Sequence, residues 1–214
     1  MIRTYGQYST SRDISVRGFC NVSVTDVGGD NFLGAKPQVV KAMQWPEPLV
    51  TSHRASDWVE EFVEAAELQR ALASEGALGW APDHAVARLE DGGAYYVTDL
   101  HDASSRLLAS ARFQWSVYTA AWLKDIVLGA LEGLEELQNR RGRAHGNLRG
   151  GNILVDGLLS DEGLTVALAD PATSGSIVRR SHGEQEDMRD LGLVLHEKIQ
   201  HTPIRELGGW PLED

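Results

Sequence analysis

The chain has 214 residues, a length that can bury a hydrophobic core and suits one domain or two small lobes. Its formal net charge of −11 argues against nucleic acid or a membrane surface as a partner, because binding to phosphates needs a basic surface. The single cysteine, Cys20, excludes an internal disulfide framework and a cysteine-rich zinc site. The sequence also lacks the apolar run of a signal peptide or a transmembrane helix, and both observations favour a cytoplasmic protein.

The N-terminal part of the chain has the pattern of β-strands. Valine and isoleucine alternate with polar residues over 14–16 and 22–24, and turn-forming glycine and asparagine residues follow each segment. A third strand is predicted over 38–43, and it carries one lysine, Lys41. A strand lysine most simply points to solvent, so this pattern alone leaves a functional role for Lys41 open.

A helix is predicted from Ser56 or Asp57 to about Ser74, since serine and aspartate accept hydrogen bonds from the free N–H groups at a helix start. Most of the glutamates on this acidic segment are expected to be solvated. The apolar side of the helix is predicted to consist of Trp58, Phe62, Ala66 and Leu72.

A hairpin and a long helix are predicted next. Val86 to Leu89 and Ala94 to Leu100 are predicted strands, because Asp91-Gly-Gly93 between them is a strong turn signal. Residues 113–139 are predicted to be helical, with a break near Tyr118. The apolar residues of this helix form one stripe typical of a core-facing helix: Leu123, Val127, Ala130, Leu131, Leu134 and Leu137.

A polar loop and a second hairpin follow this helix. The loop is His145-Gly-Asn-Leu-Arg-Gly-Gly-Asn152, and the second strand of the hairpin alternates over 164–168 before it ends near Asp170. An asparagine amide oxygen and an aspartate carboxylate brought together in this way can share a hard cation that bridges nucleotide phosphates. Taken alone, the loop is also explained by a packed histidine and a left-handed turn at Asn147.

These features resemble the protein-kinase family. His145-Gly-Asn-Leu-Arg-Gly-Gly-Asn152 is similar to the catalytic loop H-R-D-L-x-x-x-N, and Asp170-Pro-Ala172 stands where D-F-G is expected. The resemblance implies an α+β fold of the bilobal protein-kinase-like type. The β-rich N-lobe, with one long helix, is expected over 1–98, and a mostly helical, shortened C-lobe over 99–214, ending soon after a helix at 187–200.

The resemblance also implies a nucleotide site that binds ATP and Mg²⁺ weakly. Lys41 would pair with a helix glutamate, for which Glu64 is the best match and Glu60, Glu61 and Glu67 are competitors. The implied cofactor-binding residues are Lys41, Glu64, the gatekeeper Thr98, the hinge residues Asp99 and Leu100, and the metal ligands Asn152 and Asp170.

The sequence departs from the kinase pattern where the chemistry is located. Asn147 stands at the position of the catalytic base and has no carboxylate, and the segment around Gly18 lacks the glycine-rich phosphate loop. General-base assistance is typically worth about 10²–10⁴-fold in rate. Asn147 and Arg149 remain the candidate catalytic residues, since an amide can orient a hydroxyl group and a guanidinium can neutralise a phosphate. Whether the chain is an enzyme is left open, with a pseudokinase favoured.

Three functions are consistent with these patterns. The favoured one is a pseudokinase that acts as a protein-binding or regulatory module, with weak Mg-ATP binding and no phosphate transfer. The alternative is a low-activity or atypical ATP-dependent kinase or nucleotidyltransferase, because phosphoryl transfer depends mainly on positioning and charge. The third is an unrelated α+β interaction domain, since short motifs also occur by chance.

The last predicted helix begins near Asp187, which by resemblance bonds to the backbone of the catalytic loop. Its apolar residues point around most of its circumference: Met188, Leu191, Leu193, Val194, Leu195 and Ile199. Few residues follow to cover them, and uncovered apolar surface commonly marks an interaction site. The face around Met188–Ile199 is therefore expected to bind another protein or a second copy of the chain.

Overall fold

The computed structural model describes residues 3–17, 20–26, 36–43, 53–104, 119–158, 162–173 and 183–201. The chain divides into two compact units. The first comprises Met1–Glu75, Ala81–Leu100 and Thr173–Ser176, and the second comprises Gly76–Trp80, His101–Ala172 and Ile177–Asp214. Each unit is therefore made of three separate stretches of the chain. The lobe boundary between residues 98 and 99 stays a prediction.

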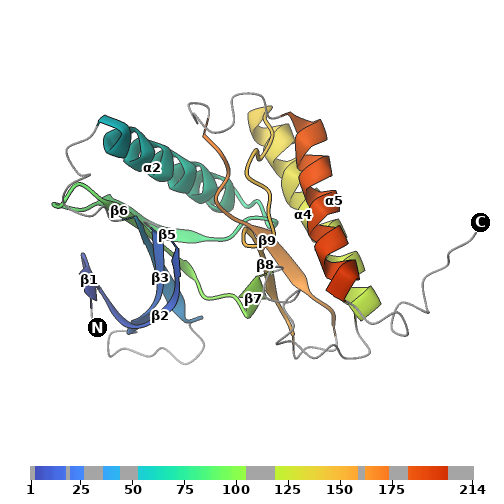
Figure 1. Ribbon diagram of the computed structural model, residues 1–214, viewed down its shortest axis with the longest axis horizontal. Helices are drawn as coiled ribbons and strands as arrows, with labels where there is room; N and C mark the ends of the chain where they lie inside the picture. The colour runs from blue at the N-terminus through green and yellow to red at the C-terminus, as the bar shows by residue number, and fades with distance from the viewer. Residues whose placement is uncertain are drawn as a thin grey trace, which may run out of the picture. The chain divides into compact units, whose positions relative to one another are not determined.

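The first unit contains a six-stranded antiparallel sheet (Figure 1). Its strands, in the spatial order β1-β2-β3-β4-β6-β5, are β1 (Arg3–Tyr5), β2 (Tyr8–Arg17), β3 (Cys20–Asp26), β4 (Gln38–Met43), β5 (Asp83–Arg88) and β6 (Ala94–Asp99). The predicted strands are confirmed, and so is the turn at Asp91–Gly93. There Gly92 has a φ of +84°, and the Gly93 N–H donates to Oδ1 of Asp91 at 3.1 Å.

Helix α2 (His53–Ser74) packs against β5 and β6 of this sheet (Figure 1). It begins before the predicted cap, so Ser56 and Asp57 lie inside the helix. The prediction that Trp58 lies on the apolar side is wrong, because Trp58 is 37% exposed while the next residue, Val59, is 4% exposed. The residues that α2 contributes to the core with the sheet are Val59, Phe62, Val63 and Ala66.

The opposite face of the sheet has its own apolar core, because side chains alternate between the two faces of each strand. Val40 and Ala42 of β4 lie in this core with Tyr5 and Tyr95. Burial, with a smaller contribution from Tyr8, raises the pKa of the Tyr95 phenol, so this group stays neutral at physiological pH. Lys41 lies between Val40 and Ala42 in β4, so its side chain is on the opposite face of the sheet, which α2 covers.

In the part of the chain that the structure describes, the second unit has two helices and a three-stranded antiparallel sheet. The elements are α4 (Thr119–Arg141), α5 (Glu184–His201), β7 (Ala103–Ser104), β8 (Ile153–Asp156) and β9 (Thr165–Leu168), with the strand order β7-β8-β9. The predicted second hairpin is confirmed, with Ile153 opposite Leu168. The sequence patterns did not indicate β7. Residues 113–118, including the predicted break near Tyr118, lie outside the described residues.

Helix α4 packs against β8 and β9, and it also holds the segment Gly76–Trp80 (Figure 1). Four residues of the predicted apolar stripe of α4 are buried, namely Leu123, Ala130, Leu134 and Leu137, and the other two, Val127 and Leu131, are half-buried. Ile126, which the predicted stripe omitted, is fully buried. The Glu136 carboxylate accepts hydrogen bonds from the N–H groups of Leu78 and Gly79, each at 2.9 Å. The Trp80 indole N–H donates to the carbonyl of Gly133 at 2.9 Å.

Helix α5 buries one face in the second unit. Asp187, Leu191 and Val194 are buried, whereas Met188 is 44% exposed and Leu193 is 54% exposed. Among the described side chains of α5, Met188 and Leu193 are therefore apolar residues on the surface, whereas Leu191 and Val194 belong to the core. No helix among the described residues is long and apolar enough to span a membrane.

Gly133 of α4 and Gly192 of α5 are both interior helix positions, yet alanine is predicted to have opposite effects at the two. A Cβ atom at Gly133 would lie 2.8 Å from the backbone oxygen of Gly79, which cannot move cheaply. A Cβ at Gly192 would meet no atom of the described residues within 4 Å. We expect Gly192→Ala to raise the free energy of unfolding by about 1 kcal/mol through helix propensity, and Gly133→Ala to lower it by roughly 1–2 kcal/mol.

Urea denaturation of the two variants checks this prediction. Equal changes in the free energy of unfolding for both glycines would contradict the close approach of α4 to the segment Gly76–Trp80.

Candidate functional site

The loop His145–Asn152 is held in place by a carboxylate from α5. Oδ2 of Asp187 accepts a hydrogen bond from the His145 N–H at 2.6 Å, and Oδ1 accepts one from the Gly146 N–H at 2.8 Å. Asp187 is 2% exposed, so both bonds are made away from water. The expectation that Asp187 bonds to the loop backbone is confirmed.

His145 is fully buried and connects the loop to two other segments. Its ring stacks on Trp80, with a centroid distance of 5.6 Å and an interplanar angle of 21°. The Asn147 N–H donates to Nδ1 of His145 at 3.2 Å, so Nδ1 is an acceptor. Nε2 then carries the proton and donates to the Ala169 carbonyl at 3.2 Å. This arrangement describes a neutral imidazole that serves as a packed connector.

The segment after β9 is bound to the loop by successive hydrogen bonds. The Ala172 N–H donates to the His145 carbonyl at 2.7 Å, and the Arg143 guanidinium donates to the Ala172 carbonyl. The Asn147 side-chain N–H donates to the Asp170 carbonyl at 2.8 Å. The turn at Asp170–Ala172 is therefore fixed from both ends by residues of 143–147.

Asp170 has an unusual backbone conformation. Its φ is +56°, in the left-handed region, and it is the one residue other than glycine with a positive φ among the described residues. Such a conformation costs an aspartate of the order of 1–3 kcal/mol and persists only where surrounding contacts hold it. Pro171 follows directly and adds crowding, because a proline ring restricts the residue before it.

Asn152 lies beside this turn and is 3% exposed. Its side-chain N–H donates to the Asn147 carbonyl at 2.8 Å. The side-chain oxygen of Asn152 therefore points away from that carbonyl. The Ala169 N–H donates to the Asn152 carbonyl at 3.0 Å. The structure thus brings Asn147, Asn152 and Asp170 together, whereas Arg149 is an exposed residue of the same loop.

Asn152 and Asp170 carry an amide oxygen and carboxylate oxygens, which are ligand types that suit a hard cation such as Mg²⁺. No group of three or more histidine, cysteine, aspartate or glutamate residues that could hold a metal ion occurs in the described part of the chain. Magnesium that binds together with a nucleotide usually takes one or two ligands from the protein and the others from phosphate oxygens and water.

The predicted nucleotide-binding residues of the first unit lie on the sheet and on α2. Lys41 is opposite Tyr96 across β4 and β6, and its ammonium lies 5.6 Å from the centre of the Tyr96 ring. On α2, Glu64 is exposed and Glu61 is half-buried. The pairing of Lys41 with Glu64 stays a prediction, and burial makes Glu61 the competitor to test beside it.

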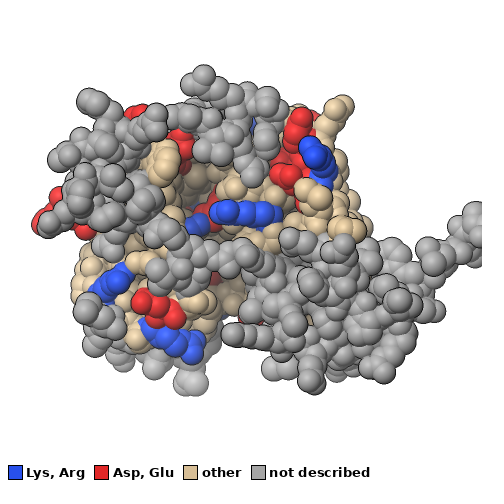
Figure 2. Space-filling view, in the orientation of Figure 1, with Lys and Arg blue, Asp and Glu red and all other residues tan. Residues whose placement is uncertain are grey.

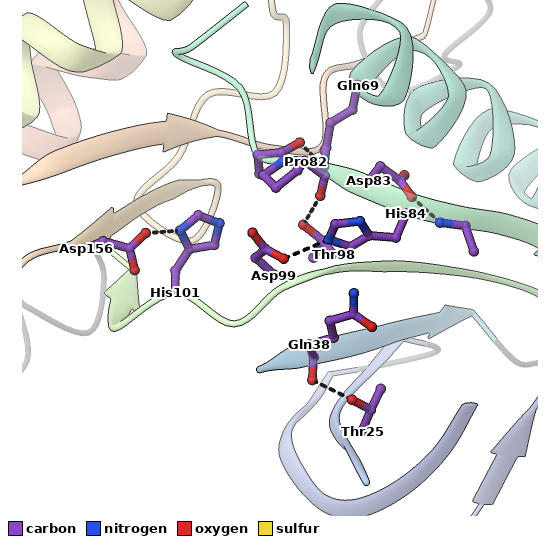
Figure 3. A network of polar contacts seen from close by, with 12 residues as sticks. Thr25, Gln38, Gln69, Pro82, Asp83, His84, Thr98, Asp99, His101 and Asp156 are labelled. Carbon is purple, nitrogen blue, oxygen red and sulfur yellow. Dashed lines mark hydrogen bonds and ion pairs between the residues drawn. The ribbon is translucent and has the colours of Figure 1, made fainter. Parts of the chain in front are cut away.

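The predicted gatekeeper and hinge residues are tied to other parts of the first unit (Figure 3). The Thr98 hydroxyl is buried and donates to the Pro82 carbonyl. The Asp99 carboxylate lies 2.7 Å from Nε2 of His84. The Leu100 N–H donates to the Pro37 carbonyl at 2.6 Å, so this amide is already used within the fold.

A polar cluster in the second unit was missed by the sequence patterns (Figure 3). Nδ1 of His101 lies 2.8 Å from Oδ2 of Asp156, and the side chain of His101 is 7% exposed. The other oxygen of Asp156 accepts the Asp102 N–H at 3.0 Å, and the Asp102 carboxylate accepts the Gly157 N–H at 2.9 Å. These bonds fasten the start of the second unit to the turn after β8. No spacing in the sequence signals them.

No protein-family model matches the sequence, and no curated protein matches it. Solved structures do match. The PknI kinase domain of Mycobacterium tuberculosis has a TM-score of 0.60 and 16% identity, over 94% of this chain and 75% of that domain. A single mutant of that domain gives 0.59, with 16% identity over 94% and 77%, and a double mutant gives 0.61, with 16% identity over 94% and 78%. The predicted α+β fold of the protein-kinase type is confirmed.

Removal of the Asp187 carboxylate is predicted to destabilise the second unit. In Asp187→Ala the buried N–H groups of His145 and Gly146 lose their acceptor, which we expect to lower the free energy of unfolding by about 2–4 kcal/mol. The control is Glu184→Ala, which removes an exposed carboxylate from the first turn of the same helix and should cost less than about 1 kcal/mol. Urea denaturation measures both, and equal losses would mean that the Asp187 bonds contribute little.

Proposed function

We propose that this chain, whose fold is that of a protein kinase, is a pseudokinase that serves as a protein-binding or regulatory module and does not transfer phosphate. The observation that carries the proposal is the state of Asn147. An amide cannot accept a proton near neutral pH, and the side-chain nitrogen of Asn147 is bonded to the Asp170 carbonyl. The position that supplies the base in active kinases is therefore occupied by a group that serves the fold.

A residual nucleotide site is the second element of the proposal. Asn152 presents an amide oxygen next to the turn that carries the Asp170 carboxylate, and these are ligand types that Mg²⁺ accepts. Lys41, on the strand face that α2 covers, would contact phosphate oxygens as a point charge. Bound Mg-ATP would supply charge and bulk that stabilise one conformation of a regulatory module, with no step of transfer.

We expect weak ATP binding that depends on Mg²⁺ and no phosphate transfer to protein substrates. Binding should raise the free energy of unfolding by about 1.4 kcal/mol at a tenfold excess of nucleotide over its Kd. Lys41→Ala and Asp170→Ala should each abolish the effect, because they remove a phosphate contact and a metal ligand. The control Lys36→Ala removes an exposed lysine of the same unit and should leave the binding unchanged.

Thermal unfolding with and without Mg²⁺, followed by calorimetry, measures this binding. An absence of binding heat at millimolar ATP for folded protein contradicts the nucleotide site and leaves a module without ligand. Labelled γ-phosphate that appears in a substrate, and disappears with Asp170→Ala, supports an active kinase or nucleotidyltransferase in place of a pseudokinase.

The exposed part of α5 is the proposed interaction surface, for another protein or a second copy of the chain. Met188 and Leu193 expose 44% and 54% of their surface on this helix. In Figure 2 the acidic and basic side chains of the described residues lie beside one another in small mixed groups on the visible face. Contacts by apolar side chains, with charges at the edge, are typical of protein interfaces.

Adjacent residues of α5 allow a matched test of this surface. Leu193→Glu should change the melting temperature by less than about 2 °C, because Leu193 is exposed. Val194→Glu should lower the free energy of unfolding by at least about 3 kcal/mol, because it buries a charge. Where light scattering shows self-association, Leu193→Glu should reduce the mass. If Leu193→Glu unfolds the chain as Val194→Glu does, the proposed surface is ordinary core.

A further inference from the structure

Among the described residues, the side chain of Asn147 makes one hydrogen bond that depends on the residue type at this position. Its amide nitrogen donates to the Asp170 carbonyl oxygen at 2.8 Å. The other two hydrogen bonds of Asn147 use its backbone: the N–H donates to Nδ1 of His145, and the carbonyl accepts from Asn152. Any residue other than proline at position 147 could keep these backbone bonds. The bond to the Asp170 carbonyl is therefore the one that requires an asparagine side chain.

The carbonyl that Asn147 holds belongs to the strained residue of the second unit. Asp170 has a φ of +56° and precedes Pro171, whose ring crowds the residue before it and brings no N–H of its own. The bond from the Ala172 N–H to the His145 carbonyl, at 2.7 Å, fixes the far end of the turn. The bond from Asn147 fixes the near end, at the residue that bears the unfavourable conformation.

We infer that Asn147 is a positioning residue that holds Asp170 in its left-handed conformation. Only the NH₂ end of the amide can face a carbonyl oxygen, which identifies the donor without ambiguity. An ionised aspartate of the same size has acceptors alone and would repel that oxygen. An aspartate at position 147 would supply a base but would also lose the bond that holds the Asp170 turn. The asparagine therefore has a structural role of its own.

Replacing Asn147 tests the role of its donor group. We expect Asn147→Ala to lower the melting temperature by roughly 3–8 °C at neutral pH, because the bond to Asp170 is lost. Asn147→Asp should melt no higher than Asn147→Ala, although it nearly preserves the size of the side chain. Asn139→Asp makes the same exchange at an exposed position of α4 and should shift the melting temperature far less. Wild-type melting of either Asn147 variant would overturn the inference.

A double-mutant cycle separates positioning of Asp170 from general support of the loop. Glycine adopts a positive φ without strain, so in an Asp170→Gly background the Asn147→Ala substitution should cost less than about half as much. In an Asp170→Ala background, which removes the carboxylate but keeps Cβ, the cost should stay near its full value. An equal cost in both backgrounds overturns the positioning role. The cycle uses no nucleotide, so its failure is distinct from a failure of ATP binding.

Discussion

The two hydrogen bonds from the Asp187 carboxylate are the constraint from which the rest of the candidate site follows. They fix the backbone at His145 and Gly146. With that backbone fixed, the carbonyl of His145 can pair with Ala172, and the side chain of Asn147 can reach the carbonyl of Asp170. A carboxylate suits this position because it accepts two buried N–H groups at once, through bonds stronger than those between neutral groups.

A second support reaches the same loop from the side of α4. Glu136 binds the N–H groups of Leu78 and Gly79, and the indole of Trp80 binds the Gly133 carbonyl. Trp80 then stacks on the ring of His145. The loop is therefore held by α5 through hydrogen bonds and by Trp80, itself bonded to α4, through an aromatic contact. These two supports keep Asn147, Asn152 and Asp170 close together.

The fold was largely predictable from the sequence because its signals are local. The alternation in β2, β3 and β9, the turn at Asp91 and the stripe of α4 each depend on spacing within one element. Trp58 was misplaced because a helix with several apolar positions has more than one plausible face, and packing against β5 and β6 selects between them. The predicted start of α2 was also wrong, because serine and aspartate occur inside helices as well as at their N-terminal caps, so their presence does not fix the first residue.

The candidate site was predictable only in part. The loop, Asp170 and Asp187 stand in recognisable order, so their proximity could be expected from resemblance. The stack of Trp80 on His145 and the pair of His101 with Asp156 join residues that are far apart in sequence and have no periodic relation. The left-handed conformation of Asp170 was also unexpected, because proline after it argues against a positive φ.

The placement of Gly76–Trp80 in the second unit has a consequence for biosynthesis. The partners of Leu78, Gly79 and Trp80 on α4 lie 58, 57 and 53 residues further along the chain. A ribosome that adds about 5–20 residues per second needs on the order of 3–10 s to synthesise that stretch. During this interval the nascent chain presents an indole and two peptide N–H groups that have not yet met their partners on α4. The hydrogen bonds of this short segment with α4 can therefore form only after α4 has been synthesised.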